Sequence, residues 1–283
     1  MGRRTTVRTF AERKRAGERI TMVTAYDAQQ GRLVDAAGID AVLVGDSVAN
    51  VCHGHDTTLP VTLDEMVMHT RWVRRGVERA LVVGDLPFMS YQTGPVDALR
   101  AAGRMLKEAG ADAVKLEGGR SVAQAVEACC RAGIPVMGHV GLTPQSVKAF
   151  GGFRVQGRSR ERAAEVLEDA LALERAGAFC VVLECVPHEL ARRITERLTI
   201  PTIGIGAGPH TDGQVLVLHD LLGLLPGPSP RFVKRYDELG ARAQRALEAF
   251  RDEVRAGRFP TNEHSYAMDP DALVGIEPVA DEA

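Results

Sequence analysis

AAGIDAV at residues 36–42 and EAGADAV at residues 108–114 are two copies of one pattern: a helix end, an Ala-Gly pair and a short apolar run. RAGIPV at 131–136 and RAGAFC at 175–180 repeat it more loosely. Glycine just past a helix can take the left-handed conformation that ends the helix, and the β-rich residues that follow then begin a strand. Repeated helix-to-strand junctions predict a parallel α/β fold.

Apolar runs predict the strands of this fold. They lie near residues 20–25, 39–45, 80–84, 111–116, 134–138, 179–184, 200–205 and 214–218. Most are apolar at successive positions, as is typical of strands buried on both faces of a parallel sheet. These runs alternate with helical segments, so they predict one closed (β/α)8 TIM barrel.

Three helical segments between these runs have recognisable starts. Thr62 and Glu65 form a capping box that opens a helix to about residue 75. Ser121 and Gln124 are spaced in the same way, and predict a helix to about residue 132. Ser159 begins a segment to about residue 176 that is rich in good helix formers.

The length of 283 residues and the hydrophobic content of 45% suit one barrel, which typically takes about 250 residues. We found no linker, and expect residues 1–268 to form a single catalytic domain. Residues 269–283 are acidic, contain Pro270 and Pro278 and lack periodicity. We expect them to form a flexible C-terminal tail.

Charge and cysteine usage exclude several classes of protein. The net charge of −2 argues against a nucleic-acid partner. Five cysteines without a CxxC pair argue against a zinc site or a disulfide framework, and favour free thiols in a cytoplasmic protein. The chain has no apolar run of about 18 residues, so no membrane span is expected. Its N-terminus lacks the hydrophobic stretch of a signal peptide.

Carboxylates follow four of the predicted strands: Asp46, Asp85, Glu117 and Glu184. The active site of a (β/α)8 barrel lies at the C-terminal ends of its strands. A single aspartate there is also a common turn residue or helix cap, but several carboxylates at one rim repel one another without a cation or shared protons. Asp46, Asp85 and Glu117 offer hard oxygen ligands, which favour magnesium or manganese over zinc.

Three further polar residues at these strand ends each have a functional and a structural interpretation. Lys115 shares a strand face with Glu117, and can bind a substrate carboxylate or an enolate oxygen, or form a structural ion pair. His139 can donate a hydrogen bond or exchange a proton near neutral pH, or be a satisfied core histidine. Glu184 can act as a general base, or cap the helix that follows Pro187.

Two other patterns resemble ligand sites. GIGAG at 204–208 resembles part of a dinucleotide loop, but Pro209 takes the sixth position of the GxGxxG pattern. Such a loop can also hold phosphate, and we expect its glycines to let the backbone approach a ligand. HGHD at 53–56 resembles a metal cluster, although the same composition is ordinary for a mobile lid.

Long motifs in these regions resemble one family, the 3-methyl-2-oxobutanoate (ketopantoate) hydroxymethyltransferases. They run in family order over residues 5 to 266: TAYD (24–27), VGDS (44–47), GHDTTLPVT (54–62), DLPFMSY (85–91), VKLEGG (114–119), GHVGLTPQSV (138–147), FGGFRVQGR (150–158), LECVP (183–187), IPTIGIGAG (200–208), TDGQVLVLHDLLG (211–223) and EHSY (263–266). The departures are minor: Cys52-His53 precedes the shared GHD stretch, and residues 269–283 extend past the usual end.

The resemblance implies a barrel of the phosphoenolpyruvate/pyruvate-like group and a bound Mg2+. The family's metal positions correspond to Asp46, Asp85 and Glu117. Its 2-oxo acid is held at positions corresponding to Asp46, Ser47, Asp85 and Lys115. All of these residues are intact in this sequence.

The resemblance also assigns the remaining roles. Glu184 corresponds to the proposed proton acceptor, and His139 to a residue that lines the site and contacts the substrate. The implied reaction transfers a hydroxymethyl group from 5,10-methylenetetrahydrofolate to 3-methyl-2-oxobutanoate through a Mg-stabilised enolate. Its product is 2-dehydropantoate, in pantothenate biosynthesis. The family implies a homo-oligomer, commonly a decamer.

Two other interpretations remain open from the sequence. A sister enzyme of the same barrel group, such as a 2-oxo acid lyase or a phosphonopyruvate-type mutase, would use magnesium and an enolate without folate. A barrel that only binds a metabolite or protein partner would not turn substrate over. Metal-dependent turnover distinguishes the two.

Overall fold

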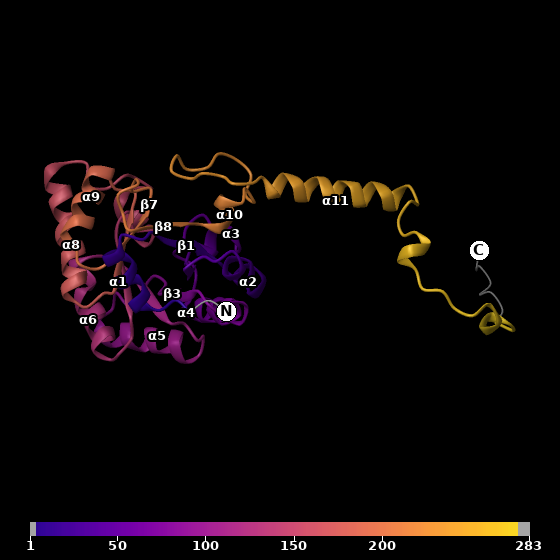
Figure 1. The fold of residues 1–283 in the computed structure, drawn as a ribbon, viewed down its shortest axis with the longest axis horizontal. Helices are drawn as coiled ribbons and strands as arrows, with labels where there is room; N and C mark the ends of the chain where they lie inside the picture. Colours follow the sequence, from indigo (N-terminus) through magenta and orange to yellow (C-terminus); the bar gives the residue numbers. More distant parts are fainter. Residues whose placement is uncertain (1–3, 277–283) are drawn as a thin grey trace. The chain divides into compact units, whose positions relative to one another are not determined.

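The computed structural model describes residues 4–276. Parallel strands of these residues close into a barrel in chain order, and the last strand pairs with the first (Figure 1). The strands are β1 (Ile20–Thr24), β2 (Ala41–Val44), β3 (Leu81–Asp85), β4 (Ala113–Glu117), β5 (Val136–Gly141), β6 (Cys180–Glu184), β7 (Thr202–Ile205) and β8 (Gly213–Leu216). The predicted (β/α)8 barrel is therefore confirmed.

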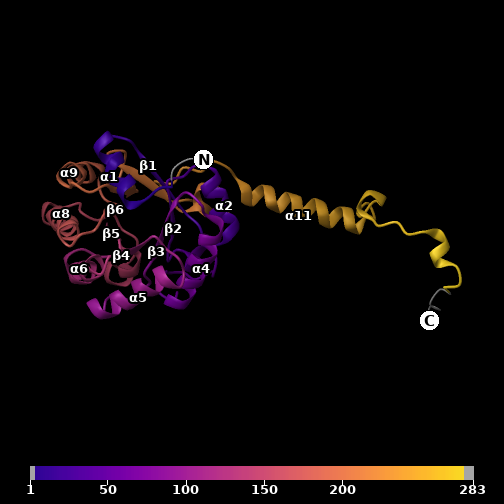
Figure 2. The same cartoon turned by 60° about the horizontal axis from the view of Figure 1, so that its bottom comes forward.

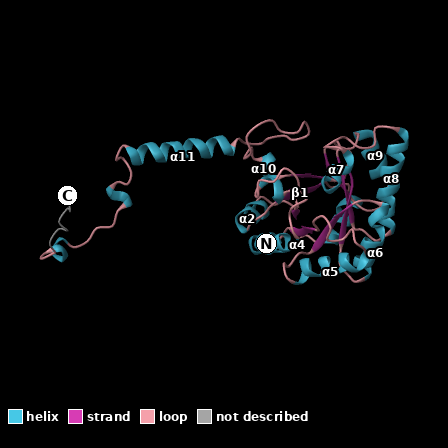
Figure 3. Ribbon diagram, turned by 180° about the vertical axis from the view of Figure 1, so that it is seen from behind, coloured by secondary structure: helices cyan, strands magenta, loops and turns pink. Residues whose placement is uncertain are grey.

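Helices surround the strands, as Figures 2 and 3 show. The longer helices of the barrel are α1 (Val7–Ala16), α2 (Ala28–Ala36), α4 (Leu63–Gly76), α5 (Pro95–Lys107), α6 (Ala123–Arg131), α8 (Arg160–Arg175) and α9 (His188–Arg197). The short helices α3 (Val48–Val51), α7 (Val147–Phe150) and α10 (Leu218–Leu221) come after the carboxyl ends of β2, β5 and β8. The C-terminal ends of the strands thus carry extra short elements that can shape a site.

Buried side chains form two core clusters. One packs the outer faces of the strands against the helices, and the other fills the barrel interior with residues such as Met22, Leu81 and Met137. Phe10 of α1 is fully buried in the interior cluster and meets Phe179, just before β6, edge-on at 5.6 Å between ring centroids. The barrel interior is therefore packed by side chains, as is usual for this fold.

Two of the three predicted helices begin with a side-chain cap. Thr62 and Glu65 form the capping box of α4, and Ser159 Oγ accepts from the backbone N–H of Arg162 at the start of α8. The capping box expected at Ser121 is wrong. Ser121 lies inside a 3-10 turn, η1 (Arg120–Val122), and α6 begins after it without a side-chain cap.

The chain divides after Asp237 into two compact units. The second contains α11 (Leu239–Arg255) and the 3-10 turns η3 (Asn262–His264) and η4 (Pro270–Leu273), and no residue of α11 is buried. The expected catalytic domain of residues 1–268 and flexible tail of residues 269–283 stay predictions. Residues 277–283 of that tail lie outside the described residues. None of the helices in residues 4–276 is both long and apolar enough to span a bilayer.

Candidate active site

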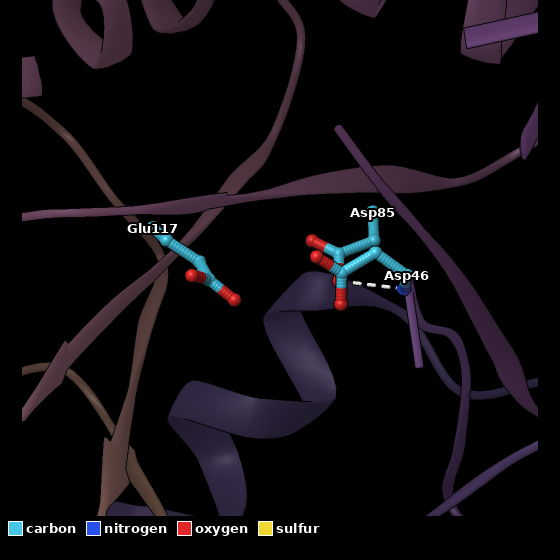
Figure 4. Close-up of side chains that lie close together, drawn as sticks. All are labelled: Asp46, Asp85 and Glu117. Carbon is cyan, nitrogen blue, oxygen red and sulfur yellow. Dashed lines mark hydrogen bonds between the residues drawn. The ribbon is translucent and has the colours of Figure 1, made fainter. Parts of the chain in front are cut away.

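Three buried carboxylates meet at the C-terminal end of the barrel (Figure 4). Asp46 follows β2 by two residues, and Asp85 and Glu117 are the last residues of β3 and β4. One oxygen from each lies within 4.8 Å of the others. The backbone N–H of Asp46 donates to Oδ2 of Asp85 at 3.1 Å, which fixes the two aspartates side by side. The strand ends thus bring together the residues that the sequence singled out as metal ligands.

The carboxylates repel one another in this buried setting. Burial, followed by the charges of Asp85 and Glu117, raises the pKa of Asp46 well above its usual range. Burial also raises the pKa of Asp85. Burial opposes ionisation of Glu117 as well, but Lys115 and His139 more than offset it, so the pKa of Glu117 is lowered. A cation among these oxygens would relieve the repulsion that raises the aspartate pKa values.

The donor set fits a hard divalent cation. Each side chain offers carboxylate oxygen, the ligand type that Mg2+ prefers. Oδ1 of Asp85 is buried without an aligned hydrogen bond, although it lies 2.9 Å from Nζ of Lys115. Within residues 4–276, no other group of three His, Cys, Asp or Glu residues brings its ligand atoms this close. The residues present therefore fit magnesium or manganese.

Lys115 and His139 connect this cluster to Glu184. Nζ of Lys115 lies 2.9 Å from Asp85 and 3.5 Å from Glu117. The two ring nitrogens of His139 lie 3.4 Å from Glu117 Oε1 and 3.2 Å from Glu184 Oε2. Glu184 therefore adjoins the acidic cluster through one imidazole, although its strand is distant from β2 and β3 in barrel order.

The neighbouring carboxylates raise the pKa of both basic groups. Burial favours neutral Lys115, but Asp85, Glu117 and Asp46 outweigh it and raise the pKa of Lys115 above its usual value. Burial and the charge of Lys115 lower the pKa of His139, while Glu117 and Glu184 raise it, and the net result is a pKa of about 9. Nδ1 of His139 also lies 3.2 Å from Nζ of Lys115, and its Nε2 is buried without an aligned hydrogen bond.

The structure supports the structural interpretation of Lys115 as an ion-pair partner but not that of Glu184 as a helix cap. Lys115 does form an ion pair with the neighbouring carboxylates, which is compatible with substrate contact. Glu184 does not cap the next helix, because α9 begins after Pro187 without a side-chain cap. Ser47 lies at the start of α3, with its Oγ 2.9 Å from the Tyr26 hydroxyl.

Sequence reasoning missed Gln145, which organises the acidic cluster. Its side-chain amide donates to Asp46 Oδ2 at 3.0 Å and to the Leu86 carbonyl at 2.9 Å. Its backbone N–H donates to Glu117 Oε2 at 3.0 Å. Its Oε1 accepts from Tyr91, whose hydroxyl oxygen in turn accepts from the backbone N–H of Glu117. Only the stretch GHVGLTPQSV, quoted for the family resemblance, contained a signal for Gln145.

The two other ligand-like patterns do not join the cluster. His53 of the HGHD stretch pairs instead with His69, at 3.0 Å between their Nε2 atoms. In the GIGAG stretch, a Cβ at Gly204, Gly206 or Gly208 would meet side chains of the chain itself. Thr211, Phe232 and His188 take that space, so close packing within the chain accounts for these glycines. The expectation that they let the backbone approach a ligand stays a prediction.

A cavity of about 520 Å³ opens above the cluster. Its lining contains every residue proposed for the site from the sequence: Asp46, Ser47, Asp85, Lys115, Glu117, His139 and Glu184. Thr58 also lines it, and its buried hydroxyl has no hydrogen-bond partner among the described residues. The arrangement offers an acidic cluster that can hold a cation, a lysine, an imidazole and a further carboxylate in one cavity.

Solved structures with this fold come from enzymes of related barrels. 2,3-Dimethylmalate lyase, a phosphoenolpyruvate mutase/isocitrate lyase superfamily member, matches with a TM-score of 0.57 at 18% identity over 95% of this chain and 93% of its own. Phosphonopyruvate hydrolase in complex with oxalate and Mg2+ matches with a TM-score of 0.59 at 13% identity over 95% of this chain and 94% of its own. At these identities the likeness shows the shared fold alone.

Sequence relatives are far more similar. A 3-methyl-2-oxobutanoate hydroxymethyltransferase of Moorella thermoacetica is 60% identical over 253 residues, which cover 89% of this chain and 94% of the relative. One of Anaeromyxobacter dehalogenans is 54% identical over 98% of this chain and 92% of the relative. The family model for ketopantoate hydroxymethyltransferase matches residues 4–262. The chain therefore belongs to the ketopantoate hydroxymethyltransferase family and is, like these relatives, a transferase.

Proposed function

We propose that this chain transfers a hydroxymethyl group from 5,10-methylenetetrahydrofolate to 3-methyl-2-oxobutanoate and so forms 2-dehydropantoate for pantothenate biosynthesis. Family membership supports the overall reaction. The observation that carries the mechanism is the meeting of three carboxylates, Lys115, His139 and Glu184 in one cavity. We also propose that the protein works in the cytoplasm as a homo-oligomer, a decamer by resemblance to its family.

Asp46, Asp85 and Glu117 would hold Mg2+. Their oxygens approach one another closely enough to share one ion, and a protein of the same fold has been solved with Mg2+ and oxalate, a small dicarboxylate. When bound, the ion supplies Lewis-acid polarisation of the keto group, which makes the neighbouring C–H bond more acidic.

The chain's own residues bind the 2-oxo acid and move its proton. Lys115 keeps its charge beside the acidic cluster, and its ammonium stabilises the negative oxygen that develops as the C3 proton leaves. Ser47 and Asp46 face the same cavity and complete the substrate site. Glu184 accepts the C3 proton, and Nε2 of His139 lies 3.2 Å from its carboxylate.

The electron pair of the C3–H bond forms the enolate double bond, and the proton passes to Glu184. The enolate carbon then attacks the methylene carbon of the donor in its iminium form and forms the new C–C bond. The C–N bond to the folate breaks, with water supplying the hydroxyl oxygen and tetrahydrofolate leaving.

Proton exchange tests this proposal. We expect NMR of 3-methyl-2-oxobutanoate in D2O with the protein to show loss of the C3 proton signal with Mg2+ but not with EDTA. Adding methylenetetrahydrofolate should then yield 2-dehydropantoate. Exchange without product would instead favour a sister enzyme of this barrel, and no exchange would favour a binding protein.

The base assignment has its own test. Glu184→Gln keeps the size of the side chain but removes the proton acceptor, so exchange at C3 should fall by about 100-fold or more, in the range of a lost general base. Exchange by E184Q at the native rate would show that another group removes the proton.

A further inference from the structure

The cavity above the acidic cluster is larger than the proposed 2-oxo acid requires. A volume of about 520 Å³ is ordinarily matched to a drug-sized ligand, whereas 3-methyl-2-oxobutanoate needs only the polar end beside Lys115. We call a second part of the wall the mouth. It is formed by apolar side chains and two arginines: Leu142, Phe153, Arg154, Val155, Arg231 and Phe232. The mouth can therefore take a second, larger and less polar molecule.

Two aromatic rings from different loops contribute to the mouth. Phe153 lies between α7 and α8 and is 61% exposed, and Phe232 follows α10 and is 37% exposed. Gly206 has a φ of 64°, and a Cβ there would lie only 2.9 Å from the Phe232 ring. This glycine therefore lets the ring approach the end of β7. Solvent-exposed rings that line a cavity favour ligands with planar rings, which can stack on them.

Each of these rings has an arginine as its chain neighbour, in Phe153-Arg154 and Arg231-Phe232. Neither guanidinium forms an ion pair or side-chain hydrogen bond with another described residue. Asp220 also lines the cavity, so the charged lining residues beyond the acidic cluster and its partners are two arginines and one aspartate. Guanidinium groups bind carboxylates through paired hydrogen bonds, so the mouth suits an anionic ligand.

We propose, on the basis of the proposed function, that the mouth binds the one-carbon donor. The planar pterin and benzoyl rings of the folate pack against Phe153 and Phe232, and its glutamate carboxylates pair with Arg154 and Arg231. Methylenetetrahydrofolate combines flat rings with an anionic chain, which are the two chemistries that the mouth offers. A donor with several glutamates presents more carboxylates, so it binds more tightly than one with a single glutamate.

Steady-state kinetics with mono- and triglutamyl methylenetetrahydrofolate test this inference. The unchanged protein should show a lower KM for the triglutamate. In the double variant Arg154→Gln and Arg231→Gln the donor KM should rise by about tenfold or more, as expected for lost charge-assisted hydrogen bonds, and the preference for the triglutamate should disappear. Phe153→Ala with Phe232→Ala should raise the KM for both donors equally. The KM for 3-methyl-2-oxobutanoate should change much less in both double variants.

Matched controls are Arg175→Gln, an exposed arginine at the end of α8, and Leu33→Ala, an exposed apolar residue of α2. Circular dichroism and direct titration with tetrahydrofolate separate weak binding from misfolding. If folded double variants bind both folates as the unchanged protein does, the inference is wrong. Failure of the proposed function is distinguishable, because the unchanged protein would then show either no metal-dependent exchange of the C3 proton or exchange without formation of 2-dehydropantoate.

Discussion

At the scale of single residues, Gln145 is the buried side chain that holds the acidic cluster in shape. Its amide donates to Asp46, and its backbone N–H donates to Glu117, so it contacts two of the three proposed metal ligands. Partners that orient metal ligands typically change metal affinity or activity about 10–100-fold when removed. We therefore expect Gln145→Ala to weaken Mn2+ binding by about this factor.

Titration with Mn2+, followed by electron paramagnetic resonance, measures this effect directly and does not depend on turnover. The matched control is Gln124→Ala, because Gln124 is exposed on α6 and contacts no proposed ligand. Equal Mn2+ affinity in Q145A and the unchanged protein would mean that the backbone alone positions the carboxylates.

The ionised carboxylate of Asp35 stabilises the fold, so its contribution to the unfolding free energy depends on pH. Burial opposes ionisation of its carboxylate, but the backbone N–H groups of Ala80, Arg79 and Glu78 and the Arg79 guanidinium outweigh this and lower its pKa. A lowered pKa in the folded state stabilises the fold above the unfolded-state pKa of about 3.9, and this stabilisation is lost as pH falls through the folded-state pKa.

Asp35→Asn should therefore cost about 2 kcal/mol at pH 7, the size of hydrogen bonds to a charged acceptor. The difference in unfolding free energy between the two proteins should shrink below about pH 4. Urea denaturation of both proteins at several pH values measures this difference. A difference that does not vary with pH would contradict the carboxylate's role.

The sequence predicted the positions of the charged site residues because a simple rule covers them. Asp46, Asp85, Glu117 and Glu184 end strands or follow them closely, and such positions converge in a parallel barrel. Gln145 obeys no such rule. It lies in the 3-10 turn after β5, and its direction depends on how that loop packs against Tyr91. The roles of the four carboxylates in binding and catalysis stay proposals.

At the scale of elements, the repeated helix-to-strand junction contains an aspartate whose purpose only the structure reveals. Asp40, in AAGIDAV, accepts from the backbone N–H of Thr21 in β1 at 2.9 Å and pairs with Arg13. Asp112, in EAGADAV, accepts from the backbone N–H of Val82 in β3 at 3.0 Å. These aspartates join neighbouring strands at the N-terminal end of the barrel, where residues serve stability rather than catalysis.

The starts of the strands were predictable to within two residues. Before β2, β4, β5 and β6, a glycine that ends the preceding helix fixes where the strand begins. The short helices α3, α7 and α10 were not predicted. Four-residue helices have too few turns to show periodicity, and they depend on packing rather than on propensity. Ser121 shows the same limit. Its spacing to Gln124 matches a capping box, but it lies inside the 3-10 turn after β4 and does not cap α6.

Gly141 lies at the end of β5, where the backbones of β5 and β6 approach each other closely. Its φ is 94°, and a Cβ there would lie 2.3 Å from the backbone carbonyl oxygen of Glu184. Gly141→Ala must therefore move the ends of β5 and β6, which carry His139 and Glu184. We expect a loss of about 2 kcal/mol or more from overpacking and backbone strain, with a larger fractional loss of proton exchange at C3.

Gly103→Ala is the matched control. Gly103 lies within α5, and a Cβ there meets nothing within 4 Å. Alanine at such a helical position should stabilise the protein by about 0.4–1 kcal/mol. Thermal unfolding and the C3 exchange rate, measured on both variants, check the prediction. A G141A protein with native stability and exchange would show that the strand ends can separate without cost.

At the scale of the whole molecule, the second unit does not itself bury an apolar face of its helix α11. Leu247, Phe250 and Val254 of α11 are 69%, 55% and 45% exposed and follow one another at helical spacing. Contiguous exposed apolar residues typically mark a protein interface, and the proposed homo-oligomer supplies a partner for this face. We predict that α11 contributes to assembly.

Light scattering coupled to size-exclusion chromatography tests this prediction on the full chain. The unchanged protein should elute as a homo-oligomer, and Leu247→Ser with Phe250→Ser should shift the mass toward smaller species, because polar side chains remove the apolar area that would be buried between copies. Gln244→Ser, also exposed on α11, should leave the mass unchanged. A monomeric unchanged protein would contradict the oligomer itself, whereas an oligomer that survives the double serine variant would place its contacts on the barrel instead of on α11.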